Sequence, residues 1–454
     1  MSATDVLSAR EQRAQEKQRL LATHTVVVSL SFNLPGLPKS TALTRAAFAH
    51  VADTLTQFFC AHRCALHAQP TVHDAAGDHA LWHGDPHIEA TALKALTEQF
   101  EHEHALGRLL DVDVYTPEGP IRSGAHKRCL FCEAPALVCM RSAQHSTVAL
   151  RTHCDQQLRA WRNATQSTRH ARLLASSMTR ALMEEVLLTP KPGLVDQQDS
   201  GSHDDMDLPL FVQSVSALAP YWERVAQLGA HFDGSAWHEA LIALRRIGLE
   251  MEHAMQCATQ GINTHKGAIF LGCLSVFSHA YAWRTGTACP REYQRILRML
   301  SRDLVISDMK AMNSSDSYGQ HLLHTYEDAR VGGPRYQAEH GLPGVFDYGL
   351  PALHDAFKAH MPGHTAQLHA LLTLMANVLD TNVLHRSSLT TAHRFMALAQ
   401  RACSVLPPNE SDIEHLSAFC AEHWISAGGC ADLLAMTLFF HHADCATVPY
   451  DSHQ

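Results

Sequence analysis

The hydrophobic pattern changes near residue 165, and this change constrains the fold more than any other feature. From there onward, apolar residues recur at helical spacing, beginning with Leu173, Leu174, Met178, Leu182 and Val186. The same periodicity returns over 208–229, 236–260, 265–283, 290–312, 364–384, 389–405 and 431–441. Because strand patterns are nearly absent from this part, residues 169–454 are predicted to form an all-helical domain.

The preceding part of the chain mixes helix and strand patterns. Three segments predict helices: 6–22, 41–63 and 80–110. Two segments predict strands: 25–36, which is β-branched and ends in Asn-Leu-Pro-Gly, and 111–115, which alternates. We therefore expect an α/β domain over 1–155, joined by a short polar connector over 155–168 to the helical domain.

Composition narrows the class of protein. The 454 residues suffice for two or three domains. The first 21 residues lack the apolar core of a secretion signal, and no run approaches the ~18 apolar residues of a membrane span. Thirteen cysteines, mostly scattered singly, are typical of free thiols in a reducing compartment. We expect a cytoplasmic protein with no membrane partner and, without a long basic run, no nucleic-acid partner.

Polar groups gather where the first predicted helix of the second domain ends, in "TPKPGLVDQQDSGSHDDM" (189–206). The prolines stop that helix and hold Lys191 in a rigid turn. Asp196, Asp204 and Asp205 follow, together with His203. Closely spaced carboxylates repel one another unless a cation compensates them, and Mg²⁺ with a bound phosphate suits such oxygen ligands. The alternative is a solvated acidic loop.

A second polar island, "GINTHKGAIF" (261–270), begins an apolar helix. Asn263 or Thr264 can cap that helix, which places His265 and Lys266 in its first turn. A lysine there opposes the helix dipole, and a bound phosphate removes the conflict. Two further islands, "DTNVLHRSS" (380–388) and "SAGGCADLL" (426–434), also interrupt apolar helices. Each could be only a cap or a turn, but four together predict one polar cleft lined by helix ends.

These islands resemble the motifs of the triphosphoribosyl-dephospho-CoA synthase family, in family order over about 170–445. The resemblance implies an all-α fold that joins ATP to 3′-dephospho-CoA and releases adenine. It also implies an oxocarbenium-like transition state, carboxylates that stabilise it, and an acid that protonates adenine. The site residues it implies are Lys191, Asn263, His265, Lys266, Arg335, His385 and Arg386 for phosphate or nucleotide, Asp196, Asp204 and Asp205 as Mg²⁺ ligands or base, and Glu185 and Glu252 as further catalytic carboxylates.

The first domain contains a weaker set of features. In "LLDVDVY", Asp111 and Asp113 are two apart, so both point to one face of a strand and can hold Mg²⁺ against a leaving diphosphate. A solvated edge strand is the alternative. "FNLPGLPKS" places Lys39 after a proline-fixed turn, and Arg10 and Arg13 share one face of the first helix.

Together, "AREQR", "SFNLPGLPKS", "GRLLDVDVY" and "RCLFCEAPALVCMRSAQHS" resemble the citrate lyase holo-acyl-carrier-protein synthase family over about 5–155. The resemblance implies transfer of phosphoribosyl-dephospho-CoA to a serine of the apo-citrate lyase acyl carrier protein, with diphosphate leaving. Asp111 and Asp113 would hold the metal. The implied phosphate contacts are Arg10, Arg13, Lys39, Arg128 and Arg141.

One cysteine cluster is open to two interpretations. Cys129, Cys132, Cys139 and His145 give C-x2-C-x6-C-x5-H, which is close to zinc spacing. The alternative is a buried, thiol-rich turn, and the family resemblance does not imply zinc.

The two resemblances predict a bifunctional enzyme that makes the triphosphoribosyl precursor and then attaches it to the carrier protein. One alternative is a non-catalytic nucleotide-binding module, which would bind ATP or dephospho-CoA without releasing adenine. The other is the equivalent cofactor pathway of malonate decarboxylase, which the first domain argues against.

Overall fold

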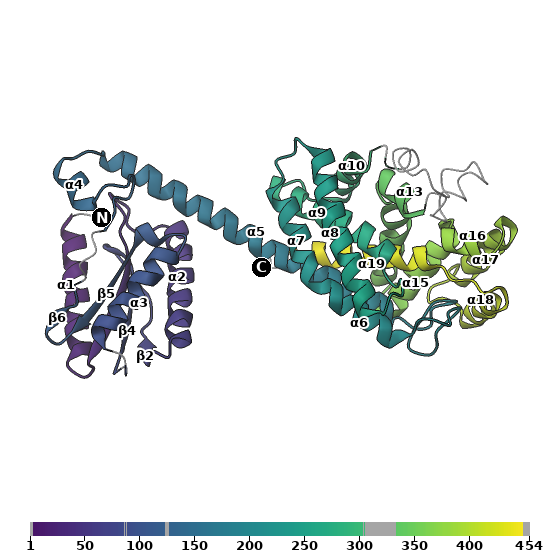
Figure 1. Cartoon of the computed structure of the whole chain (residues 1–454), viewed down its shortest axis with the longest axis horizontal. Coiled ribbons are helices and arrows are strands. Elements are labelled where there is room, and N and C mark those ends of the chain that lie inside the picture. Colours follow the sequence, from purple (N-terminus) through teal and green to yellow (C-terminus); the bar gives the residue numbers. More distant parts are fainter. Residues whose placement is uncertain are drawn as a thin grey trace. The chain divides into compact units, whose positions relative to one another are not determined.

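A computed structural model describes residues 3–85, 87, 89–122, 127–302, 304 and 333–447. The chain divides into two compact units, residues 1–166 and 167–454, which are described separately (Figure 1). Helix α5 (Thr147–Leu187) has residues in both. The polar connector expected over 155–168 is wrong, because those residues lie within α5. Its 41 residues include no proline or glycine, so nothing in the sequence interrupts the helix.

The first unit is built on a six-stranded antiparallel sheet with the order β2-β4-β1-β5-β6, in which β3 also pairs with β4. The strands are β1 (Val26–Phe32), β2 (Leu66–Ala68), β3 (Val72–Asp74), β4 (Gly77–Gly84), β5 (Leu110–Thr116) and β6 (Gly119–Pro120). The strands predicted at 25–36 and 111–115 are therefore confirmed as β1 and β5. The helix predicted over 80–110 is wrong at its start, since β4 continues to Gly84. Most of β4 is buried on both faces, and such a strand lacks the polar alternation that marks a half-exposed one.

Helices cover both faces of this sheet (Figure 1). The helices of the first unit are α1 (Ala3–Leu21), α2 (Ala42–Ala61), α3 (Ala90–Glu103), the 3₁₀ turn η1 (Gly107–Leu109) and α4 (Ala136–Arg141). Phe48 of α2 and Leu93 of α3 pack with Val28 and Val112 on one face. Leu20 of α1 packs with Val27 on the other. Side chains alternate along a strand, so the polar residues between the core residues of β1 and β5 lie on the α1 face.

The second unit is helical throughout its described part. Its elements after α5 are α6 (Leu208–Leu218), η2 (Ala219–Tyr221), α7 (Trp222–His231), α8 (Trp237–Ala258), α9 (Lys266–Thr285), α10 (Pro290–Leu300), α13 (Gly333–Glu339), the π-helical turn η4 (Gly344–Gly349), α14 (Leu350–Lys358), α15 (Gly363–Asn377), α16 (Thr381–Arg386), α17 (Leu389–Ala402), α18 (Glu410–His423) and α19 (Gly428–Thr447). One core runs through them, with Trp222, Phe277 and Phe440 among its largest buried side chains. Among the described helices, none is both long and apolar enough to cross a membrane.

Most predicted helices of this unit are confirmed, with interruptions. The predicted 208–229 is split by η2, and 364–384 is split into α15 and α16. The prediction over 290–312 is confirmed as α10 as far as Leu300, and its residues 305–312 lie outside the described residues. Helices α13, α14 and α18 were not predicted. The predicted helix at 265–283 corresponds to α9, which has 13 buried residues and lies against α7, α8, α10 and α19.

A buried histidine gives this unit a pH-dependent stability. His170 of α5 is 4% exposed, and its ring stacks on Trp283 with the centroids 4.0 Å apart. Burial, and then the charge of His279, lower the pKa of His170 to about 3. In the unfolded chain its pKa returns to ~6.5, so the unfolded state binds more protons between these two values. The free energy of unfolding must therefore fall as the pH falls below ~6.5, by up to about 1.4 kcal/mol per pH unit for this group.

We expect the midpoint of urea unfolding to drop between pH about 7.5 and about 5.5. The variant His170→Phe keeps a ring on Trp283 but has no proton site, so its midpoint should change less with pH. His238→Phe, at an exposed position of α8, is the control and should keep the wild-type pH dependence. An unchanged pH dependence in His170→Phe would contradict this account.

Candidate functional site

The helical unit contains a cavity of about 730 Å³, within the range of ~300–1,000 Å³ typical of small-molecule sites. It receives residues from α5, the loop that follows α5, α8, α9, α13, α16 and α19. The predicted site residues that line it are Glu185, Lys191, Glu252, Asn263, His265, Lys266, Arg335, His385 and Arg386. All four polar islands of the sequence therefore meet at one cavity.

The loop after α5 holds a buried ion pair against this cavity. Lys191 Nζ donates to Glu185 Oε1 at 2.8 Å and to the Glu185 carbonyl oxygen at 2.8 Å, and both side chains are almost fully buried. Gly193 allows the turn, because its φ of +73° is left-handed and a Cβ there would lie 2.3 Å from the Ile425 carbonyl oxygen. The pair thus presents a fixed cation and a fixed carboxylate to the cavity.

The aspartates of this loop lie outside the cavity lining. Asp196 is buried, and its carboxylate accepts hydrogen bonds from the backbone N–H groups of Lys191 at 2.9 Å and Gln198 at 2.7 Å. It therefore orders the loop. Asp204 and Asp205 are exposed. They lie next in sequence to His203, which does line the cavity, and Asp205 Oδ1 is 3.8 Å from His203 Nδ1.

The N-terminus of α9 forms another wall. The helix begins at Lys266, whose backbone N–H donates to Asn263 Oδ1 at 3.1 Å, so Asn263 satisfies one free donor of the first turn. The Lys266 side chain is 60% exposed and its Nζ lies 3.1 Å from Glu252 Oε2 of α8. An ammonium group and a helix N-terminus therefore face the cavity together, as the sequence predicts.

His265, just before α9, is kept neutral. Its Nδ1 lies 2.7 Å from Ser214 Oγ, and its buried Nε2 has no partner among the described residues. Burial, and then the charge of Lys191, lower the pKa of His265 to about 3. A neutral ring with a free nitrogen can hydrogen-bond a substrate in this cavity, but it does not supply positive charge to a phosphate.

Asp432 of α19 lines the cavity and was not among the predicted residues. Burial, and then the charges of Glu185 and Asp380, raise its pKa well above the usual range. A Cβ at Gly267 would lie 1.9 Å from Asp432 Oδ2, so the carboxyl group touches the first turn of α9. A carboxyl group of this kind keeps its proton and can act as an acid.

Helix α16 supplies the last wall. Asp380 caps it by accepting the Asn382 N–H at 2.8 Å, and its other oxygen accepts the Cys430 N–H at 2.8 Å, which ties α16 to α19. Arg386 donates to the Ser202 carbonyl oxygen at 2.6 Å and lies 3.4 Å from His203 Nδ1. The cap thus fixes the helix that carries Arg386 and His385 to the cavity.

A second polar site lies on the sheet of the first unit. Asp111 and Asp113 are half-buried on β5 between buried Leu110, Val112 and Val114, so the predicted shared face is confirmed. In the register of the sheet they stand opposite Ser31 and Ser29 of β1.

Two lysines flank this aspartate pair. Lys127 Nζ contacts Asp111 and lies 3.6 Å from Glu101 Oε1, and Lys94 Nζ lies 3.7 Å from Asp113 Oδ1. The carboxylates have side-chain exposures of 41% and 38%, so both remain open to solvent. The face offers two accessible carboxylates beside the half-exposed ammonium group of Lys127, whereas Lys94 is buried and donates to the Val112 carbonyl oxygen at 2.7 Å.

Positively charged side chains from α1, from α5 and from the proline-fixed turn before Lys39 act on one another in this unit. Lys39 contacts the Leu34 carbonyl oxygen, and burial, followed by the charges of Arg10 and Arg151, lowers its pKa. Arg151 of α5 donates to the Pro38 carbonyl oxygen at 2.6 Å and forms an ion pair with Asp155 at 3.0 Å. Mutual repulsion of this kind is relieved when an anion binds.

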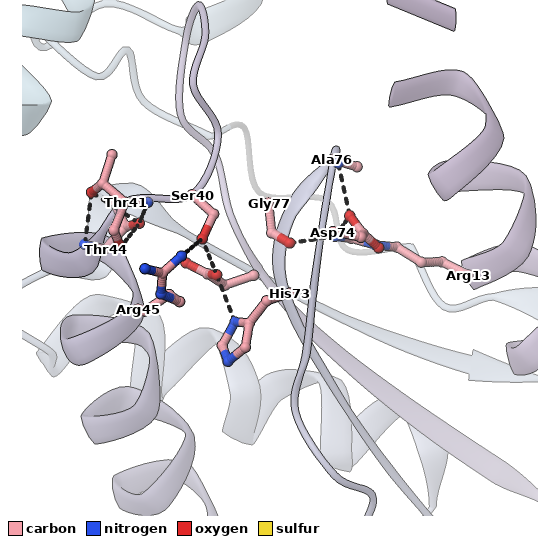
Figure 2. Close-up of polar contacts among 10 residues, drawn as sticks. Arg13, Ser40, Thr41, Thr44, Arg45, His73, Asp74, Ala76 and Gly77 are labelled. Atoms are coloured by element: carbon pink, nitrogen blue, oxygen red, sulfur yellow. Dashed lines mark hydrogen bonds and ion pairs between the residues drawn. The ribbon is translucent and has the colours of Figure 1, made fainter. Parts of the chain in front are cut away.

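Arg13, predicted as a phosphate contact, is occupied within the protein. Its guanidinium forms two hydrogen bonds with Asp74, at 2.9 and 2.5 Å, and one with the Gly77 carbonyl oxygen at 2.8 Å (Figure 2). These bonds fasten α1 to the β3–β4 hairpin. The remaining predicted cations, Arg128 and Arg141, are exposed, and Arg128 pairs with Glu133 at 3.1 Å.

Asp78 is a buried carboxylate that the sequence did not single out. It is 2% exposed, and its Oδ1 accepts hydrogen bonds from Ser40 Oγ at 2.7 Å and from His73 Nδ1 at 2.8 Å. Its Oδ2 has no partner among the described residues. Asp78 holds Ser40, the residue after Lys39, and so helps to fix the turn that carries that lysine.

Comparisons with known proteins match both units. The family model described as ATP:dephospho-CoA triphosphoribosyl transferase matches residues 171–448, and the one described as apo-citrate lyase phosphoribosyl-dephospho-CoA transferase matches residues 1–161. Protein CitXG of Leuconostoc mesenteroides subsp. cremoris is 28% identical, with 97% of this chain and 96% of the relative aligned. Protein CitXG of Haemophilus influenzae is also 28% identical, over the same shares.

A relative of the second part alone, 2-(5''-triphosphoribosyl)-3'-dephosphocoenzyme-A synthase of Pectobacterium atrosepticum, is 36% identical over 58% of this chain and 87% of its own length. The first of the two family models covers more than half of the chain. The chain therefore belongs to the ATP:dephospho-CoA triphosphoribosyl transferase family, and it carries an apo-citrate lyase phosphoribosyl-dephospho-CoA transferase domain ahead of that part.

Proposed function

We propose that this chain is a bifunctional transferase of citrate lyase prosthetic-group biosynthesis. The helical unit makes 2′-(5″-triphosphoribosyl)-3′-dephospho-CoA from ATP and 3′-dephospho-CoA. The first unit then transfers phosphoribosyl-dephospho-CoA to the apo-citrate lyase acyl carrier protein. The single observation that carries this proposal is the convergence of four separate polar islands on one ligand-sized cavity within the part that the triphosphoribosyl transferase model matches.

In the first reaction, the 2′-hydroxyl oxygen of dephospho-CoA bonds to the anomeric carbon of ATP ribose while the bond to adenine breaks. Lys191, Lys266 and Arg386, with the N-terminus of α9, bind the triphosphate. Asp432, whose raised pKa keeps it protonated, donates a proton to the departing adenine. Glu252 accepts the proton of the attacking hydroxyl.

Asp204 and Asp205, which follow the cavity-lining His203 in sequence, would hold Mg²⁺ at this site. Both carboxylates are exposed, and the charge of Asp205 acts on Arg386, which lines the cavity. A triphosphate held by Arg386 would therefore bring its oxygens near oxygen ligands of the kind Mg²⁺ prefers. When bound, the ion would neutralise phosphate charge. The buried Asp196 orders the loop and takes no part in the chemistry.

In the second reaction, a serine hydroxyl of the carrier attacks the phosphorus next to the ribose and diphosphate leaves. Asp111 and Asp113 offer Mg²⁺ two accessible carboxylates on one strand face, and their donor chemistry fits that ion. Lys127 beside them, together with the cations near Lys39, would contact the diphosphate. The free cysteines of the chain suit a reducing compartment, which supports a cytoplasmic location.

The test uses the purified full chain with ATP, 3′-dephospho-CoA and Mg²⁺, followed by apo-citrate lyase carrier protein. We expect adenine release by chromatography and a gain in carrier mass by mass spectrometry. Nucleotide binding without adenine release would favour the non-catalytic binding module. Modification of the malonate decarboxylase carrier in preference to the citrate lyase carrier would favour that pathway.

Lys266→Ala should lower kcat/KM for adenine release by roughly 10- to 100-fold, because a hydrogen bond to a charged group contributes ~1.5–3 kcal/mol. The side chain is largely exposed, so the fold should persist. Lys358→Ala is the control, since Lys358 is an exposed lysine of α14 outside the cavity lining. Near-normal turnover in a folded Lys266→Ala variant would remove this lysine from the phosphate site.

A further inference from the structure

We propose that Cys129, Cys132, Cys139 and His145 bind a zinc ion that has a structural role in the first unit. Each residue offers one ligand atom, and the four atoms lie within 4.8 Å of one another. Cys132 Sγ is 3.5 Å from Cys139 Sγ and 3.3 Å from His145 Nε2. With Zn–S bonds of ~2.3 Å, two sulfur ligands of a tetrahedral zinc lie about 3.8 Å apart, so a small adjustment completes the site.

The set of ligands identifies the metal and its role. Three thiolates and one imidazole form a soft donor set, which favours zinc over the hard cations Mg²⁺ and Ca²⁺. Four protein ligands fill a tetrahedron and leave no position for water or substrate, which is the arrangement of structural zinc sites. The cluster is therefore a separate feature from either proposed catalytic site.

The surrounding backbone supports a metal at this place. The Phe131 N–H points to Cys129 Sγ, with N and S 3.4 Å apart, as a hydrogen bond to a metal-bound thiolate requires. Cys139 Sγ contacts Gln144 Oε1 at 3.3 Å, and rotating that amide by half a turn would place its NH₂ group there as a donor. Both contacts are thus compatible with deprotonated sulfur.

The described part of this segment has little regular secondary structure, and its short helix is largely exposed. Helix α4 has only six residues, and among its apolar side chains Leu137 is 56% exposed and Met140 is 75% exposed. Among the residues described before it, one isolated bridge joins Arg128 to Pro135. Small elements with so little buried apolar surface are commonly held by a metal, whose binding free energy stabilises the fold.

Zinc would also position a residue of the proposed transfer site. Lys127, two residues before Cys129, contacts Asp111 and lies close to Glu101. Its carbonyl oxygen accepts the Ala136 N–H at 2.8 Å, which links it to the start of α4. Through these bonds the metal cluster fixes the backbone that brings Lys127 to Asp111.

The test measures metal in the full, untagged chain, purified under reducing conditions without chelator. We expect one zinc per chain by atomic emission, and released zinc on titration of the thiols with a mercurial reagent. Cys132→Ser should remove the bound zinc. His145→Cys preserves four soft ligands and should retain it. Cys60→Ser, at an exposed cysteine of α2, is the matched control and should leave the zinc content unchanged.

If Cys132→Ser misfolds, the proposal can still be tested with the wild-type chain. Cobalt added to the zinc-free chain should give the visible absorption of a tetrahedral thiolate site, and zinc should displace it. The proposal is overturned if the reduced chain contains no zinc and binds neither zinc nor cobalt. It is equally overturned if the purified chain has a Cys132–Cys139 disulfide and binds no metal after reduction, or if Cys132→Ser keeps its full zinc content.

Discussion

Replacing Asp432 with asparagine should reduce adenine release by about 100- to 10,000-fold, the range expected for loss of a general acid. Asparagine has nearly the same shape but no proton to give to the departing base. Asp432 lines the cavity beside Lys191 and Lys266, and burial with two neighbouring carboxylates raises its pKa. The loss should therefore appear mainly in kcat, with little change in the affinity for ATP.

The thermal stability of the Asp432→Asn variant distinguishes a role as the acid from a purely structural role. A carboxyl group with a raised pKa destabilises the folded state at neutral pH, so Asp432→Asn should leave the melting temperature unchanged or raise it. Transfer of a separately prepared precursor to the carrier should continue. Asp355→Asn, at an exposed aspartate of α14, is the control. Adenine release within about threefold of the wild-type rate in a folded Asp432→Asn chain would rule out the acid role.

The sequence predicted the cationic side of this cavity because helix ends are marked locally. Proline stops the helix before Lys191, and Asn263 accepts the first free N–H of the helix that begins at Lys266. These rules need only a few neighbouring residues. They predict which side chains lie at a helix end. In the folded unit, the ends of several packed helices lie at one cavity, so these side chains come together there.

Asp432 and Asp204 show where such local rules stop. Asp432 lies near the start of an apolar helix, and its importance depends on the contact between α19 and α9, which no neighbouring residue reveals. Their close spacing in the sequence predicted that Asp204 and Asp205 are Mg²⁺ ligands or a catalytic base. In the structure both side chains are exposed and lie outside the cavity lining. Burial and the approach of distant segments decide these cases, and they follow only from the folded chain.

In the first unit, too, local sequence patterns predicted some features and missed others. The alternation of β5 predicted that Asp111 and Asp113 share a face, because the period of a strand is local. Strand β4 was missed because it is buried on both faces, and its hairpin with β3 is what engages Arg13. Arg13, expected to contact phosphate, is therefore bound within the protein, because the half-buried Asp74 of that hairpin pairs with it.

Replacing Asp111 with asparagine should strongly reduce carrier modification while adenine release continues at the wild-type rate. Asp111 belongs to the accessible carboxylate pair of β5, and its neighbours Lys127 and Glu101 lie in the first unit. Loss of one carboxylate would weaken Mg²⁺ at the leaving diphosphate, and we expect a decrease of at least about 100-fold. The side chain is 41% exposed, so the sheet should fold normally.

The measurement follows both reactions in one sample, adenine by chromatography and carrier mass by mass spectrometry, with precursor added so that supply does not limit transfer. Asp53→Asn, at an exposed position of α2 on the opposite face of the sheet, is the matched control and should keep both activities. Carrier modification at the wild-type rate in Asp111→Asn would remove this residue from the transfer site. Loss of both activities in a folded chain would mean that the reactions are not divided between the two units as proposed.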